Sequence, residues 1–266
     1  MATTKCKKGA NVLLKFIDEK FIDSTFENGL YFNTLEAFKK SDGLSDEQAD
    51  SDEGASIRFD SHEKGYKLYD KNFNYVAKLD GKEIINSKLS KHYSFAAKVP
   101  ICCLALLKFP YDFEFIRISN QVREYKIEDK VINKLNGISG SRPFIYCLEQ
   151  EMYRCLRKTV DDGRKIIAQK VSYYRRDGMN ISEDEVKKTP YKVIFMKNEK
   201  YRNQKEFRIA LVDKKESCYL KLDELFMEKS NNLNNIRLRI NPKYDEITYS
   251  IQLCDKSEEI IYKVEE

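Results

Sequence analysis

The stretch YRNQKEFRIAL, residues 201–211, decides how this chain of 266 residues is interpreted. It runs from polar residues into an apolar segment typical of a core strand. Side chains on a strand alternate between its two faces. The alternation predicts two sets: Phe207, Ile209 and Leu211 on one face, and Gln204, Glu206 and Arg208 on the other. The first face requires a core. The second is either a solvated sheet face or the floor of a site.

Composition bounds the fold and the partners. Hydrophobic residues make up 41% of the chain, enough for a substantial core, and charged residues of both signs make up 34%. The net charge of +5 permits weak attraction to phosphate-bearing partners without requiring it. There is no arginine-rich tail and no RNA-binding signature.

Periodicity along the chain predicts an α+β protein: a mainly antiparallel β-sheet core with two helical clusters, in a single domain over 1–266. Strands are expected at 11–16, 30–32, 75–79, 82–85, 93–97, 99–109, 113–118, 166–174, 191–196, 218–222, 236–240, 247–253 and 260–264. Helices are expected at 18–26, at 35–40, up to Gly137, and from 148 to near Gly163. Asp80-Gly81 predicts a hairpin turn between the third and fourth of these strands.

Several enzyme classes lack their motifs in this sequence. There is no GxxxxGK[ST] or GxGxxG phosphate loop, no nucleophile elbow and no zinc protease or deaminase motif. The seven cysteines form no CxxC pair, and only two histidines are present, so we expect no metal and reduced core cysteines. The acidic residues of 42–54 do not have the spacing of a calcium loop, which favours a solvated, mobile loop.

The sequence also predicts where the protein resides. The N-terminal residues 1–8 are polar and basic, without the apolar region of a signal peptide. The longest apolar run, 99–107, is too short to cross a bilayer. We therefore expect a cytoplasmic protein that does not bind membranes.

A basic segment is the best candidate for nucleic-acid binding. The residues expected to bind are Arg154, Arg157, Lys158, Arg175 and Arg176; Arg164, Lys165 and Lys170 continue the segment, and Tyr153, Tyr173 and Tyr174 lie among the charges. Lysine and arginine contact phosphates, and tyrosines stack on bases. The alternative interpretation is a solvated helix face, because glutamates and aspartates are interspersed.

The pair Gln204-x-Glu206 suggests a specific chemistry. Cleavage of the N-glycosidic bond of a nicotinamide dinucleotide produces an oxocarbenium-like ribose, whose positive charge a fixed carboxylate stabilises. On a strand, a side chain two residues earlier points into the same site and can position the acceptor. An exposed polar strand face is the alternative interpretation of the same pattern.

Three segments carry a resemblance: "NVLLKF" at 11–16, "ENGLYFNTLEAF" at 27–38 and "NEKYRNQKEFRIAL" at 198–211. Together they resemble a broad bacterial and phage family that is compared with ADP-ribosyltransferase-like folds and found near phage-defence genes. The resemblance implies an ADP-ribosyltransferase-like fold, NAD as cofactor and a macromolecular acceptor. It implies that Glu206 is catalytic and that Gln204 selects the acceptor. Lys15 is the nearest equivalent of the family's phosphate-gripping residue, and Tyr31 is expected to help hold the cofactor.

Three hypotheses follow. The first is an NAD-dependent ADP-ribosyltransferase-like effector of phage defence or counter-defence. The second is a non-enzymatic, inhibitor-type protein of phage–host conflict that binds RNA or a ribonucleoprotein through the basic segment 154–176. The third gives Glu206 and Arg208 a structural role only, as cross-strand ion-pair partners on a wet sheet face.

Overall fold

The computed structural model describes residues 11–40, 54–58, 66–69, 75–79, 89–119, 122–140, 142–161, 163–174, 181–225, 227–241, 247–251 and 260–264. The chain, expected to be one domain, divides into two compact units. Each unit is built from separate segments of the sequence. Unit 1 comprises 1–33, 100–170 and 203–266, and unit 2 comprises 34–99 and 171–202. The mixed α+β class with mainly antiparallel sheets is confirmed.

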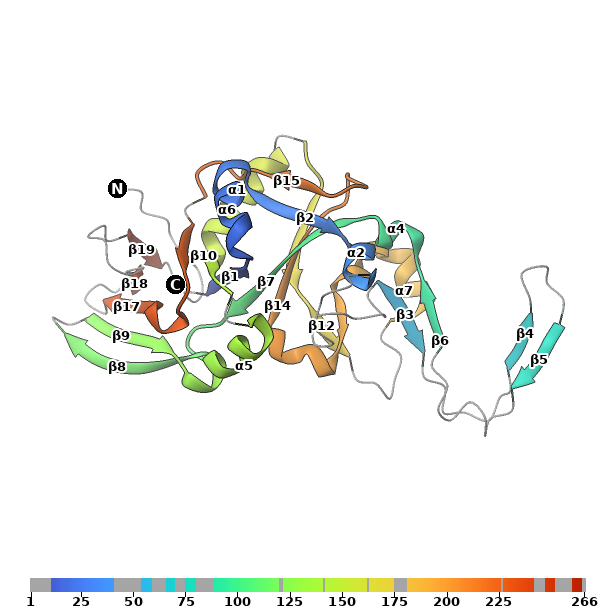
Figure 1. The fold of residues 1–266 in the computed structure, drawn as a ribbon, viewed down its shortest axis with the longest axis horizontal. Coiled ribbons are helices and arrows are strands. Elements are labelled where there is room, and N and C mark those ends of the chain that lie inside the picture. Colours follow the sequence, from blue (N-terminus) through green and yellow to red (C-terminus); the bar gives the residue numbers. More distant parts are fainter. Residues whose placement is uncertain are drawn as a thin grey trace. The chain divides into compact units, whose positions relative to one another are not determined.

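Unit 1 is organised around an eight-stranded sheet (Figure 1). The six strands of its main path are, in spatial order, β11 (Ile166–Lys170), β14 (Glu206–Leu211), β7 (Pro100–Leu107), β1 (Val12–Phe16), β10 (Phe144–Leu148) and β16 (Glu228–Ser230). Beside this path, β2 (Leu30–Thr34) pairs with β7 and with β15 (Cys218–Leu220). Each pair of neighbouring strands in the main path is antiparallel. Strand β14, which the stretch 201–211 contains, therefore lies beside β7 and two positions from β1.

One face of this sheet packs against a helix formed by the third quarter of the chain. Helix α6 (Glu149–Asp161) buries Met152, Cys155 and Leu156, whose spacing puts them on one side of a helix. They lie in the same cluster as Phe207 and Ile209 of β14, which are fully buried. Burial of such side chains contributes about 1.5–3 kcal/mol each. The same cluster takes in Ile22 of α1 (Ile22–Asn28), which follows η1 (Glu19–Phe21).

The other face of the sheet is covered by α5 (Asp129–Ser139), η4 (Leu233–Asn235) and the inner residues of a second sheet. That sheet has five strands in the order β19 (Ile260–Val264), β18 (Ile247–Ile251), β17 (Arg237–Asn241), β9 (Val122–Ile127) and β8 (Phe113–Ser119). Helix α5 continues past Gly137, where the sequence predicted its end. It stops at Gly140, which adopts a left-handed conformation with φ 60° and caps the helix.

In the residues that the structure describes, unit 2 contains short helices and three two-stranded sheets. Its helices are α2 (Leu35–Lys40), α4 (Ser94–Ala97), α7 (Glu183–Lys188) and the 3-10 helix η2 (Pro190–Phe195). Its strand pairs are β3 (Ala55–Arg58) with β6 (Leu89–His92), β4 (Tyr66–Tyr69) with β5 (Tyr75–Leu79), and β12 (Ser172–Tyr174) with β13 (Met196–Asn198). The Leu35 N–H donates to the Val99 carbonyl at 3.1 Å, and Phe95 meets Tyr191 edge to face at 5.9 Å.

Three strand predictions are wrong or incomplete. Residues 93–97 form α4 with Tyr93 as its N-cap, because the N–H groups of Ala96 and Ala97 both donate to the Tyr93 carbonyl at 3.1 Å. Residues 191–196 are mostly η2, which starts at Pro190, a residue whose fixed φ suits the first position of a helix. The strand expected at 166–174 is interrupted at Val171, giving β11 and β12.

Other predictions involve residues outside those that the structure describes. Asp80-Gly81 and the strand at 82–85 are among them, and β5 is seen paired with β4. The acidic loop 42–54 is also outside, apart from Gly54. Cys102, Cys147 and Cys155 are free and buried, as expected, and burial raises the pKa of each thiol. Within the described ranges, no helix has both the length and the apolar character needed to cross a membrane.

Candidate functional site

The start of β14 differs from the uniform strand that the sequence predicted. Gln204 is the last residue of the 3-10 helix η3 (Glu199–Gln204), and β14 begins at Glu206. Between them Lys205 has φ 50°, a left-handed conformation that breaks strand alternation. The prediction that Gln204 shares a strand face with Glu206 is therefore wrong. The alternation from Phe207 onward is confirmed, because that set lies in the core beneath α6.

Glu206 and Arg208 form a buried ion pair. Arg208 Nε donates to Glu206 Oε1 at 2.5 Å, and the side chains are 0% and 6% exposed for arginine and glutamate respectively. A wet sheet face, as the structural hypothesis assumed, is therefore wrong for these two residues. The partners lie two residues apart on one strand, so the pair is not cross-strand either. A charge-assisted bond of this kind is short and strong.

The strands around the pair define its surroundings. Glu206 lies opposite Ala105 of β7, and Ala105 lies opposite Leu14 of β1, so these three residues are on one face of the sheet. Lys15, the neighbour of Leu14, is on the opposite face. Its Nζ donates to the Cys103 carbonyl at 3.1 Å. The structure therefore does not bring Lys15 to the face that carries the Glu206 carboxylate.

Tyr31 lies on β2, where its neighbours Leu30 and Phe32 are buried in the core beneath α6. The Tyr31 side chain points the other way and is 41% exposed. Its ring contacts that of Tyr219 of β15 in a tilted arrangement, with ring centroids 5.0 Å apart and an interplanar angle of 52°. The structure thus places the two expected cofactor-holding residues in separate surroundings, one on a carbonyl of β7 and one in an exposed aromatic pair.

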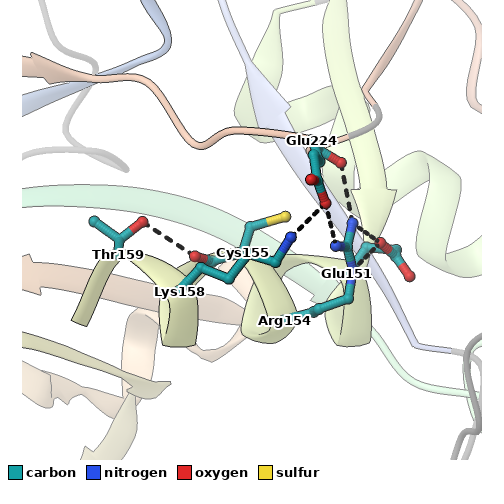
Figure 2. A network of polar contacts seen from close by, with 6 residues as sticks. All are labelled: Glu151, Arg154, Cys155, Lys158, Thr159 and Glu224. Carbon is teal, nitrogen blue, oxygen red and sulfur yellow. Dashed lines mark hydrogen bonds and ion pairs between the residues drawn. The ribbon is translucent and has the colours of Figure 1, made fainter. Parts of the chain in front are cut away.

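The basic segment is partly neutralised by acidic residues. Arg154 Nη1 and Lys158 Nζ both contact Glu224 Oε2, at 2.8 and 2.5 Å, and Arg154 also pairs with Glu151 at 2.8 Å (Figure 2). These bonds raise the pKa of Arg154 and lower that of Glu224, where the hydrogen bond from Lys158 is the largest cause. Arg157 is exposed and forms no ion pair with any residue of the described chain. Arg175 and Arg176 lie outside the described residues.

Glu224 occupies a tight turn. The Leu225 N–H donates to the Leu222 carbonyl at 3.2 Å, and Glu224 has φ 62°. Glycine or asparagine usually occupies such a position, since a side chain there is strained. Arg154 holds the turn twice, because its Nη2 also donates to the Glu224 carbonyl at 3.1 Å. Two predicted phosphate contacts, Arg154 and Lys158, therefore serve as clamps on this turn.

A cluster of three lysines, Lys108, Lys170 and Lys205, lies at one end of the main sheet; Lys170 belongs to the basic segment 154–176, and no sequence pattern linked the other two to it. Lys205 Nζ contacts Asp112 Oδ1 at 2.6 Å, and the Lys108 backbone N–H donates to Asp112 Oδ2 at 2.8 Å. Lys108 is an exposed residue, and the partial burial of its ammonium group is the first cause that lowers its pKa, followed by the neighbouring ammonium of Lys170 and then that of Lys205. The members are far apart in the sequence, so only the pairing of three strands brings them together.

The chain was compared with family models, with curated proteins and with solved structures, and none of the three comparisons found a match. The family resemblance of the sequence and the ADP-ribosyltransferase-like fold therefore stay predictions. Over the part of the chain that the structure describes, no group of three or more histidine, cysteine, aspartate or glutamate side chains is arranged to hold a metal ion.

Proposed function

We propose that this protein acts by binding, as a non-enzymatic, inhibitor-type protein of phage–host conflict whose ligand is RNA or a ribonucleoprotein. The observation that carries the proposal is the buried ion pair between Glu206 and Arg208. A carboxylate that stabilises a ribosyl cation must face the substrate with its charge available. The Glu206 carboxylate instead accepts from the buried Arg208 guanidinium and is 6% exposed. Gln204 and Lys15 do not share its strand face.

The positive charge of the protein supports the binding proposal. The chain carries a net charge of +5. In the predicted footprint, Arg157 retains an exposed guanidinium, whereas Arg154 and Lys158 are paired with Glu224. The footprint must therefore extend beyond helix α6. Electrostatic binding of this kind is independent of sequence and falls steeply with salt.

A salt series with a labelled oligoribonucleotide tests the proposal. The logarithm of the binding constant is expected to fall linearly with the logarithm of the salt concentration. Between 50 and 200 mM salt the affinity should fall roughly tenfold or more if several phosphates are contacted. Arg157→Glu is expected to weaken binding at every salt concentration. Lys229→Glu is the matched control and should leave binding unchanged, because Lys229 is an exposed basic residue on β16, outside the segment 154–176. No binding to RNA at 50 mM salt would reject the proposal.

ADP-ribosyl transfer is the rival, favoured by the resemblance of the sequence. It requires NAD turnover that disappears in Glu206→Gln, together with an NAD-dependent rise in melting temperature of the wild type. Both assays are run on the full chain beside the RNA titration. Turnover that is lost in the variant would replace the binding proposal with the enzymatic one.

A further inference from the structure

Three lysines lie at the same edge of the main sheet because of the strand order. Lys170 is the last residue of β11, Lys205 immediately precedes β14, and Lys108 immediately follows β7. These strands are antiparallel neighbours in the order β11-β14-β7. The end of the first, the start of the second and the end of the third must then meet at one edge.

The nearby carboxylate does not neutralise this cluster. Asp112 is buried, with a side chain that is 6% exposed, and both of its oxygens are engaged. One accepts from Lys205 Nζ at 2.6 Å and the other from the Lys108 backbone N–H at 2.8 Å. Asp112 thus fixes Lys205 and the turn after β7. Neither Asp112 oxygen accepts from the ammonium group of Lys108 or Lys170, and these two ammonium groups repel each other.

The exposure of these side chains differs in a way that suits a ligand. Lys205 is half-buried and held by Asp112, whereas Lys108 and Lys170 are exposed at the rim. Three positive charges and one negative charge leave a local charge of +2. Lysine presents a compact charge without the bidentate geometry of arginine, which suits a phosphoryl group approached from several directions.

We propose that this edge of the sheet binds a phosphoryl group, which the ammonium groups of Lys108 and Lys170 contact directly while Lys205 adds a third positive charge. The inference deepens the proposed function, on which it rests for one source of the phosphoryl group, the backbone of RNA. The other source is a free phosphate compound. Contacts to phosphates position a nucleic acid without reading its bases, so the site would not select a sequence.

The experiment uses the full chain and three probes: inorganic phosphate, pyrophosphate and a labelled twelve-residue oligouridylate. Calorimetry measures the first two, and fluorescence anisotropy in a salt series measures the third. The variants are Lys108→Gln and Lys170→Gln. Lys229→Gln is the matched control, because Lys229 is also an exposed lysine of the main sheet but lies on β16, the last strand of its path and outside the segment 154–176. Unfolding midpoints check that every variant is folded.

Each rim variant is expected to raise the dissociation constant roughly tenfold, because one charge-assisted contact is lost. Each should also reduce the salt slope for the oligouridylate by about 1, and the control should match the wild type. Lysine-dependent binding of the oligouridylate alone identifies RNA as the source. Lysine-dependent binding of pyrophosphate alone supports the site while contradicting RNA as its ligand.

Two results would overturn the inference. One is that no probe binds the wild type at low salt. The other is that the rim variants bind as tightly as Lys229→Gln. If the oligouridylate binds equally well to all variants, RNA binding stands and this edge is not its site, so the two proposals fail separately.

Discussion

Removing the Glu206 carboxylate is expected to destabilise the fold strongly. In Glu206→Gln the Arg208 guanidinium, which is 0% exposed, loses the carboxylate that its Nε binds while it remains buried. Breaking a buried ion pair from one side costs about 3–5 kcal/mol, because an uncompensated charge is left in the interior. Whole proteins are stable by only about 5–15 kcal/mol, so this loss is a large share.

The expected loss of unfolding free energy in Glu206→Gln determines which measurements can detect it. A loss of about 3–5 kcal/mol corresponds to a fall in melting temperature of roughly 6–20 °C, at about 2–4 °C per kcal/mol for a chain of this size. Urea denaturation gives the free energy of unfolding of four proteins: the wild type, Glu206→Gln, Arg208→Met and the double variant. Together they form a double-mutant cycle. The double variant should lose less than the sum of the single losses, with a coupling above about 1 kcal/mol.

A matched ion pair serves as the control. Glu199 pairs with Arg202 at 2.9 Å, but both side chains are exposed, at 39% and 62%. Glu199→Gln is expected to cost under about 1 kcal/mol, because water screens an exposed pair. If Glu206→Gln is as mild as Glu199→Gln, the Glu206 carboxylate is not committed to a structural pair. The case against its catalytic role would then fail.

Other predictions concern the backbone and acid stability. Gly29 has φ 92°, and a Cβ there would lie 2.2 Å from the Leu220 carbonyl oxygen, so Gly29→Ala should cost more than about 1 kcal/mol by thermal melting. Gly137→Ala, in the interior of α5 with nothing within 4 Å, should stabilise by about 0.5–1 kcal/mol, and the opposite order of the two variants would contradict the structure. Lys158 and Arg154 lower the folded pKa of Glu224 below its ordinary 4.5, so its stabilisation is complete above pH 4.5 and is lost as the pH falls through the folded pKa. Melting temperatures of the wild type and Glu224→Gln should therefore differ at neutral pH and converge below pH 4.5, and a constant difference would refute the clamp.

The candidate site shows where sequence reasoning stops. The alternation from Phe207 to Leu211 was predictable, because three apolar residues at period two indicate a buried strand face. The position of Gln204 was not predictable. The strand pattern began at Gln204 in the sequence, whereas in the structure Gln204 ends a 3-10 helix and is followed by the left-handed Lys205. Local spacing gives no sign of that conformation, because its stability depends on neighbours such as Asp112, 93 residues away.

By itself, the sequence determined the mixed α+β class, the core strands around β7 and β14, and the amphipathic helix α6, because each depends on local periodicity in side-chain polarity. The tertiary structure alone decided which charges are buried, paired or gathered. Strand pairing buried Glu206 with Arg208. A turn placed Glu224 against two basic residues of α6, and the β11-β14-β7 order assembled Lys108, Lys170 and Lys205. Such long-range juxtapositions leave no pattern in the sequence, because they arise from the packing of segments distant along the chain.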